Sequence, residues 1–363
     1  MSPWKAERLF TSSPHLASYV QRLSIAIPPP RRPEDPRVLH IPARPTKCYP
    51  PLQAVLPAFA RVQLVAFSGP ETMAWTALPT SLRLAMQAVI SLPSVTELQL
   101  TGLRIPASLI AVVAPSVPKL SLSKSEIDPS ESDPVPAISN AYPRTRSLTL
   151  DAISKSMTTF LGTPCALPNV YELFFRRLAE WSIISAILAA SAPTLTRVRV
   201  EIRRRHRSVS SGPILFPRLH ALRVLELDLV ARLDAPSPVY DRPDLSTNET
   251  VHVDTVLDEV VAQLPRTTPL LERATIRLDL TAADARELVW VDNGRPAPTA
   301  RLAHLQEVHC RLCFLGDRNA QRRDAAFAEF VRIMRGRVAG LCDAGALTFS
   351  HADAYRIDGC HIV

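Results

Sequence analysis

Four residues near the C-terminus could together hold a metal ion. The stretch "HLQEVHCRLC" contains His304, His309, Cys310 and Cys313. Thiolate and imidazole groups are the ligands that zinc prefers, and two of each would fill a tetrahedral site. The stretch also fits a strand, in which His309 and Cys310 would face opposite sides of a sheet. Buried free cysteine is a common small core residue. We therefore favour core packing and expect no metal ligand and no cofactor.

A basic run offers a second kind of chemistry. The stretch "EIRRRHRSVSSG" contains Arg203, Arg204, Arg205, Arg207 and Ser208. Clustered arginines can serve as a localisation signal or bind phosphate, and the Arg-x-Arg-x-x-Ser spacing suits a basophilic kinase. No aromatic residue interrupts the run, so nucleic-acid bases would find no stacking platform. We interpret the run as a solvated loop, with phosphorylation or nuclear targeting as alternatives and nucleic-acid binding as the least favoured.

Catalytic patterns are absent from the sequence. It contains no G-x-G-x-x-G, P-loop, G-x-S-x-G or H-E-x-x-H motif. Its ten glycines occur singly, so no glycine-rich loop is available to surround a phosphate. We expect no catalytic residue and predict that the protein is not an enzyme.

Composition indicates a globular chain with many short elements. Apolar residues make up 47% of the 363 residues, charged residues 21%, and 34 prolines stand against 10 glycines. The start "MSPWKAERLF" lacks the apolar core of a secretory signal, and the run "WSIISAILAASA" is too short to cross a bilayer. With six cysteines in so long a chain, we expect reduced thiols, no membrane partner and a cytoplasmic or nuclear location.

The architecture is indicated by a repeated apolar spacing. In "SVTELQLTGLRIP", the apolar residues Val95, Leu98, Leu100, Leu103 and Ile105 are separated by three, two, three and two positions. A helix would give steps of three and four, and a strand would give steps of two. The Leu-x-Leu pair fits a strand with both leucines in the core, followed by a turn that brings the chain inward again.

The same pattern recurs along the chain. The first strand leucine or its equivalent occurs at Leu98, Leu120, Leu148, Leu173, Val198 and Leu225, in steps of 22, 28, 25, 25 and 27. Such steps match leucine-rich repeats, whose unit is a short strand with a helix or irregular return. Segments 81–90, 181–192 and 253–264 have helical apolar spacing, and each is predicted to end at a following proline.

These patterns predict an α/β fold, an irregular leucine-rich-repeat solenoid spanning 1–363 as one domain. About ten strands would form one curved parallel sheet with helices on its convex side. Proline-rich or polar insertion loops are expected at about 27–51, 123–143 and 231–252. A capping helix and a final strand are expected at about 320–363.

Three phrases in order, "FTSSPHLASYVQRLSI", "VTELQLTGLRIPASLI" and "PSVPKLSLSKSEI", resemble the leucine-rich region of fungal F-box-like proteins. The resemblance implies a substrate receptor of a cullin-type ubiquitin ligase, with a Skp-type adaptor and a cullin as partners. In those families an F-box precedes the phrase "SPHLASYV", and only thirteen residues precede Pro14 here. We therefore expect the adaptor contact to be absent or to lie outside this sequence.

The concave face of the predicted sheet is the candidate binding surface, because solenoids generally bind partners there. The repeat phase places eight candidate protein-binding residues on it: Gln99, Thr149, Phe174, Arg176, Arg197, Arg199, Glu226 and Asp228. Phe174 beside arginines has the composition of an interface anchor. A shift of one residue would instead bury Phe174 and expose Phe175. We predict non-catalytic protein recognition, with a ligase-independent scaffold as the alternative and a nucleic-acid binder or an enzyme less favoured.

Overall fold

The chain folds into two compact units, residues 1–170 (unit 1) and 171–363 (unit 2). The computed structural model describes residues 3–27, 49–113, 116–128, 145–163, 169–178, 181–203, 215–230, 253–281, 301–315 and 320–353. The prediction of a single solenoid domain stays a prediction, and each unit is described by itself.

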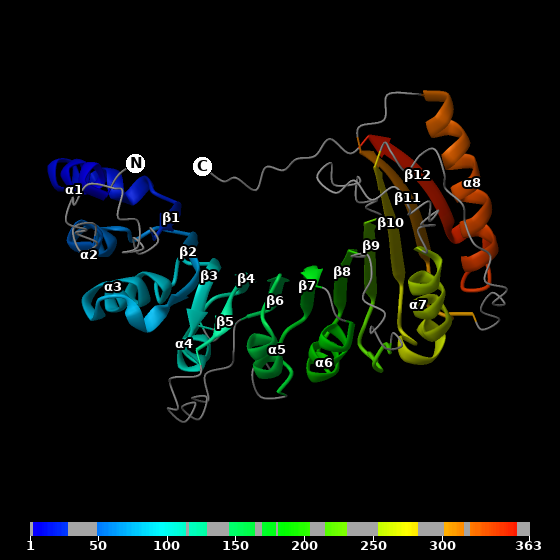
Figure 1. The fold of residues 1–363 in the computed structure, drawn as a ribbon, viewed down its shortest axis with the longest axis horizontal. Coiled ribbons are helices and arrows are strands. Elements are labelled where there is room, and N and C mark those ends of the chain that lie inside the picture. Colours follow the sequence, from blue (N-terminus) through cyan, green and yellow to red (C-terminus); the bar gives the residue numbers. More distant parts are fainter. Residues whose placement is uncertain are drawn as a thin grey trace, which may run out of the picture. The chain divides into compact units, whose positions relative to one another are not determined.

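Unit 1 is a parallel α/β sheet. Its elements are α1 (Pro3–Ser12), β1 (Arg22–Ala26), α2 (Tyr49–Val55), β2 (Leu64–Ala74), α3 (Thr80–Ile90), β3 (Glu97–Ile105), α4 (Ala107–Val113), β4 (Lys119–Ser123), β5 (Glu126–Ile127), β6 (Ser147–Asp151) and α5 (Lys155–Leu161). The strands pair in the order β1, β2, β3, β4 and β6, and β5 pairs with β3. Helices α3, α4 and α5 lie on one side of these strands (Figure 1).

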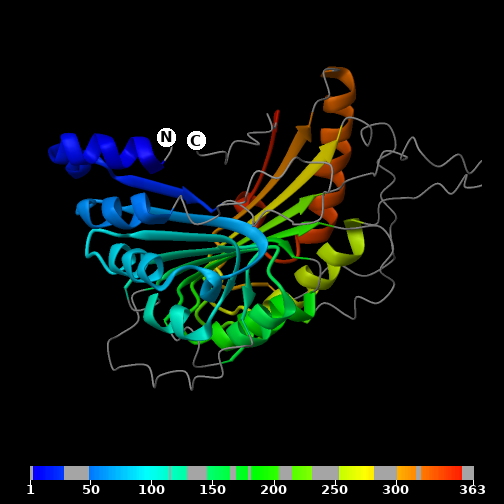
Figure 2. The ribbon, with the colours of Figure 1, turned by 60° about the vertical axis from the view of Figure 1, so that its left-hand side comes forward.

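Unit 2 repeats this architecture. Its elements are β7 (Glu172–Leu178), α6 (Trp181–Ser191), β8 (Arg197–Arg203), β9 (Val224–Val230), α7 (Val253–Thr267), β10 (Arg273–Thr281), β11 (Glu307–Leu315), α8 (Ala320–Val338) and β12 (Leu347–Asp353). The strands pair in parallel in chain order, from β7 to β12. Figure 2 shows these strands running in one direction. The predicted α/β class with parallel strands is therefore confirmed.

Apolar residues alternate along the strands and form the core. Leu98 and Leu100 in β3, like Val198 and Val200 in β8, are buried. Full burial of such a side chain contributes roughly 1.5–3 kcal/mol to the free energy of folding. Because a strand turns alternate side chains to opposite faces, the residues between these pairs lie on the other side of the sheet.

A left-handed residue explains the unusual spacing in β3. Gly102 has φ 69°, which shifts the alternation by one position, so that Leu103 and Ile105 are buried together with Leu98 and Leu100. Lys124 and Ala152 have φ 49° and 50°. All three follow residues that are paired in register across β3, β4 and β6. Three neighbouring segments of unit 1 therefore make the same turn.

Replacing Gly102 with alanine is expected to lower the free energy of unfolding by about 1–2 kcal/mol, because a Cβ atom is disfavoured in the left-handed region. The matched control is Ala152→Gly, which removes a Cβ at the equivalent turn and should change the free energy of unfolding by less than about 1 kcal/mol. Urea unfolding followed by circular dichroism compares the two. Equal losses in both variants would contradict a shared left-handed turn.

The helices largely follow their predicted ranges. Helices α3 and α6 end before Pro93 and Pro193 as predicted, but α7 continues through Pro265 to Thr267, so the predicted end at Pro265 is wrong. Proline has no N–H to donate to the helix. The last turn of α7 is nevertheless closed by a hydrogen bond of 2.9 Å that Thr268 N donates to the Leu264 carbonyl. Among the described residues, no helix is both long enough and apolar enough to cross a bilayer.

The predicted insertion loops lie mostly outside the described residues. Residues 231–252 lie there entirely, as do the greater parts of 27–51 and 123–143. Within its described part, the second range contains the short strand β5, and α2 already begins at Tyr49. The predicted C-terminal helix and strand are present as α8 and β12.

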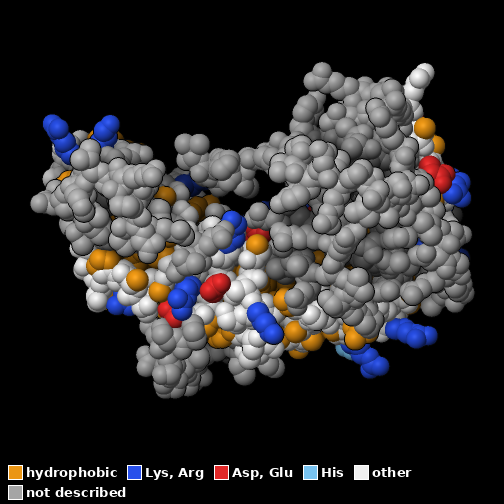
Figure 3. Space-filling model, viewed as in Figure 1, with side chains coloured by type: hydrophobic (Ala, Val, Ile, Leu, Met, Phe, Trp, Pro, Cys, Tyr) orange, Lys and Arg blue, Asp and Glu red, His pale blue; other side chains and the backbone are white. Residues whose placement is uncertain are grey.

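Charged and apolar side chains are mixed on the side of the molecule drawn in Figure 3. In the described part of that side, lysine and arginine side chains are dispersed and do not form one basic patch. Recognition of nucleic-acid phosphates usually relies on lysines and arginines clustered on one face or stripe. Among the described residues of this side, no such cluster is visible.

Candidate protein-binding face

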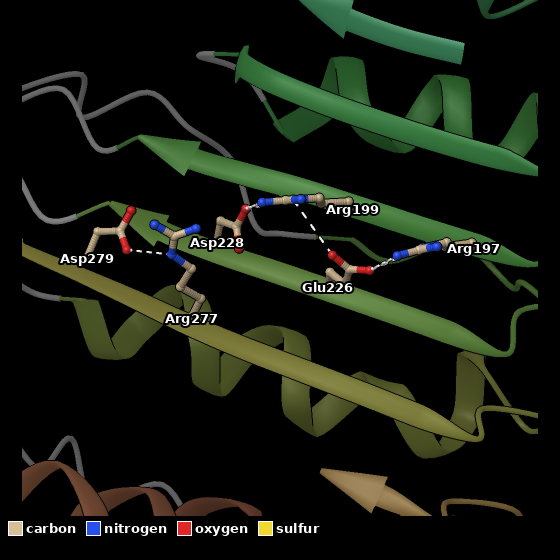
Figure 4. Close-up of polar contacts among 6 residues, drawn as sticks. All are labelled: Arg197, Arg199, Glu226, Asp228, Arg277 and Asp279. Atoms are coloured by element: carbon tan, nitrogen blue, oxygen red, sulfur yellow. Dashed lines mark hydrogen bonds and ion pairs between the residues drawn. The ribbon is translucent and has the colours of Figure 1, made fainter. Parts of the chain in front are cut away.

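One face of the unit 2 sheet carries most of the predicted binding residues. We call it the open face; it consists of the side chains of β7 to β11 that point away from the buried residues Leu173, Val198 and Leu225. In Figure 4 the arginines and carboxylates of β8, β9 and β10 lie on one side of these strands, with helices behind them. The local reason is the alternation of apolar and charged residues in "TRVRVEI" and "VLELDL".

Phe174 lies on the open face and is half-buried. Its neighbour Phe175 is 1% exposed and lies in the core, so the structure has the predicted register and not the one shifted by a residue. The Arg197 guanidinium carbon lies 5.9 Å from the centre of the Phe174 ring. A guanidinium within about 6 Å of the centre of an aromatic ring has a favourable cation–π interaction with it.

Two arginines of β8 pair with two carboxylates of β9. Arg197 Nη2 lies 2.5 Å from Glu226 Oε1, and Arg199 Nη2 lies 2.7 Å from Asp228 Oδ2. Arg199 Nε also lies 3.7 Å from Glu226 Oε2, which links the two pairs (Figure 4). The network follows from the register, because Arg199 is paired with Glu226 across the strands.

Burial changes the acidity of one member of this network. Desolvation raises the pKa of the Asp228 carboxyl above its ordinary value of 3.8, while the charge and hydrogen bond of Arg199 lower it. The raised pKa means that burial outweighs the attraction to Arg199. Asp228 is therefore a carboxylate whose ionised form depends on its arginine partner.

The sheet extends the open face beyond the predicted residues. Arg277 of β10 is paired in register with Asp228, and its Nε lies 2.7 Å from Asp279 Oδ1. On β11, Arg311 is paired in register with Arg277, and a ring nitrogen of His309 lies 2.8 Å from the Ser350 hydroxyl. The alternation in "ATIRLDL" and "VHCRL" would have indicated this extension.

The remaining predicted residues lie in unit 1, elsewhere in unit 2, or outside the described residues. Gln99 and Thr149 lie between buried leucines as predicted, but both are in unit 1. Arg176 is exposed and follows Phe175 in β7. Of the predicted basic loop, Arg203 is the last residue of β8, and Arg204, Arg205, Arg207 and Ser208 lie outside the described residues.

The histidine and cysteine residues that were considered as metal ligands do not lie on one face of the sheet. His309 and Cys310 lie on opposite faces of β11, as predicted, and Cys310 and Cys313 also face opposite sides. In the part of the chain that the structure describes, no group of three or more His, Cys, Asp or Glu side chains could hold a metal. Cys310, Cys313 and Cys342 are free and buried.

Cys310 is expected to be chemically inert in the folded protein. Burial raises the pKa of its thiol to about 12, so almost no reactive thiolate is present at pH 8. A maleimide reagent should leave Cys310 unmodified in the native chain and modify it fully in guanidinium chloride. Peptide mapping by mass spectrometry measures both states. Rapid modification of Cys310 in the native chain would contradict its position in the core.

Comparisons with known proteins do not assign a family. The sequence matches no protein-family model and no curated protein. A functional proposal therefore depends on the residues and geometry of the open face.

Proposed function

We propose that this chain is a non-catalytic protein-recognition module and that the open face of unit 2 binds its partner. The observation that supports this most directly is the half-buried Phe174 ring, which has a cation–π contact with Arg197 and is paired in register with Arg199. Aromatic residues and arginines are enriched among the residues that dominate binding energy at protein interfaces. A rigid phenyl ring that already lies against a guanidinium loses little conformational entropy on binding.

We further propose that the fold is an irregular leucine-rich-repeat solenoid. Three features support this: helices that alternate with parallel strands, pairs of buried apolar residues two positions apart in most strands, and the left-handed residue that recurs at Gly102, Lys124 and Ala152. In such a fold each repeat buries its apolar edge only against the neighbouring repeats, which leaves one face of the sheet for a ligand.

The sequence resemblance to F-box-like proteins supports a specific role, the substrate-binding part of a cullin-type ubiquitin ligase in the cytoplasm or nucleus. A ligase-independent scaffold is the alternative. Affinity purification with a tag at the C-terminus, followed by mass spectrometry, distinguishes them. Recovery of a Skp-type adaptor and a cullin supports the ligase role, and recovery of other partners without them supports the scaffold.

Replacing Phe174 with alanine is expected to weaken binding of the partner recovered in this way by about 30-fold, the effect of losing an interface anchor worth about 2 kcal/mol. The control is Tyr19→Ala, which removes a ring that is 76% exposed in unit 1. Isothermal titration calorimetry measures both affinities. Unchanged affinity in Phe174→Ala would exclude the open face as the binding surface.

A further inference from the structure

We infer that the open face binds an acidic segment of its partner, in which two or more carboxylates lie around an apolar side chain. This inference rests on the proposed function, since it names the chemistry of the partner that the same face would bind. Arginines and carboxylates are both abundant on the face, so their numbers alone do not indicate a preference. Their depths do.

In each ion pair of the open face, the arginine side chain is more exposed than the carboxylate side chain that it binds. The Arg197 side chain is 43% exposed and that of Glu226 is 17% exposed. Arg199 is 37% exposed against 11% for Asp228, and Arg277 is 30% exposed against 14% for Asp279. In all three ion pairs the arginine is the more exposed member, so an approaching partner meets positive charge first.

Further residues of the open face increase the excess of exposed arginines over exposed carboxylates. Arg176, Arg273 and Arg311 are exposed, and none has an ion pair with another described residue. Among the carboxylates of the described open face, Glu307 is the exposed one. Complementary charge at an interface favours the matching partner and disfavours partners of the same sign.

The β8 arginines retain hydrogen-bonding capacity. Arg197 and Arg199 each use Nε and Nη2 for their carboxylate partners, which leaves Nη1 of each without a partner among the described residues. The two arginines are two positions apart on a strand, about 6.6 Å at 3.3 Å per residue. An extended partner segment with acidic residues at alternate positions has the same spacing, and its apolar side chain can cover Phe174.

The composition of the face favours protein over nucleic acid. Phe174 is the one phenyl, phenol or indole ring on the described open face, whereas binding of single strands uses several stacked aromatics. The carboxylates of Glu226, Asp228 and Asp279 are ion-paired with the arginines and reduce the long-range attraction that a phosphate backbone requires. Short-range contacts to individual carboxylates depend less on that attraction.

The test uses the purified full chain and a library of random twelve-residue peptides displayed on phage. We expect the selected peptides to have net negative charge and an enrichment of Asp/Glu-x-Asp/Glu next to an apolar residue. The triple variant R176Q/R273Q/R311Q should bind the strongest selected peptide at least about tenfold more weakly, because three rim charges are lost while the ion pairs remain.

A control variant separates local charge from total charge. R218Q/R301Q/R332Q removes three exposed arginines outside the strands of unit 2 and changes the net charge by the same amount. It should bind the peptide as the unmodified chain does. Equal weakening in both triple variants would show a non-specific charge effect and overturn the inference.

The other outcomes separate this inference from the proposed function. Selected peptides that are neutral or basic, or no selected peptide at all, contradict the acidic segment. If neutral peptides are selected and Phe174→Ala abolishes their binding, the open face remains the binding surface and the inference fails. Acidic peptides that bind equally well to Phe174→Ala and to R176Q/R273Q/R311Q contradict both proposals. Displacement by a single-stranded oligonucleotide of equal charge would indicate a nucleic-acid partner and also overturn the inference.

Discussion

Replacing Phe175 with alanine is expected to lower the free energy of unfolding by about 3–5 kcal/mol, because a phenyl ring is lost from a closely packed core. The Phe175 side chain lies among the buried residues of unit 2 and is 1% exposed. The neighbouring variant Phe174→Ala is expected to lower it by less than about 1 kcal/mol, because that ring is half-buried on the open face.

The two phenylalanines form a matched pair for this experiment. They differ by one position in the same strand, so side-chain type and strand propensity are equal and burial differs. Chemical unfolding monitored by tryptophan fluorescence gives both free energies. Equal losses, or a larger loss for Phe174→Ala, would mean that the register of β7 is shifted by one residue and that the open face is wrongly assigned.

Replacing Arg199 with methionine is expected to lower the free energy of unfolding by about 2–3 kcal/mol at pH 7, since it leaves the buried Asp228 carboxylate without its main partner. The value is below that of a fully buried pair because Arg199 is more than a third exposed. Asp228→Asn should change the free energy by less than about 1 kcal/mol, because the raised pKa of Asp228 indicates surroundings that favour a neutral group.

The pH dependence supplies the control. A carboxyl with a raised pKa in the folded state binds its proton more strongly there, so its ionisation reduces stability as pH rises from about 3.8 through the raised pKa. Removing Arg199 raises that pKa further. The difference between the Arg199→Met variant and the unmodified chain should therefore shrink as the pH falls from 7 to 4.5. A constant difference would show that lost packing, and not the unpaired carboxylate, causes the instability.

Arg199 thus combines two roles, which affects how binding can be tested. It presents a guanidinium on the open face and also lowers the pKa of Asp228, with which it is paired. A loss of binding on its replacement would not distinguish a lost contact from a loosened sheet. Arg176 and Phe174 are better probes of binding. Arg176 has no ion pair with another described residue, and Phe174 is uncharged, so replacing either breaks no ion pair among the described residues.

Much of the fold could be predicted from the sequence because its signals are local. Apolar residues two positions apart predicted strands such as β3 and β8, since the alternation of side chains in a strand is fixed by the backbone. Which residues of a strand are buried could not be predicted where a further apolar residue is adjacent to the pair of apolar residues. In "RVQLVAF" several apolar residues are adjacent, and the buried pair is Val65 and Phe67, whereas Leu64 is half-exposed.

The sequence also predicted which residues of β7 to β9 lie on the open face, including Phe174, Arg199 and Glu226. The prediction did not include Arg277, Asp279 and Arg311, although the alternation in their strands indicates the same phase. That β10 and β11 continue the face of β9 follows from their pairing in the sheet. Only the tertiary structure decided the relative depth of the charges. The sequence has Arg197 and Arg199 in β8 and two carboxylates in β9, and in each ion pair of the folded sheet the longer arginine side chain is the more exposed member.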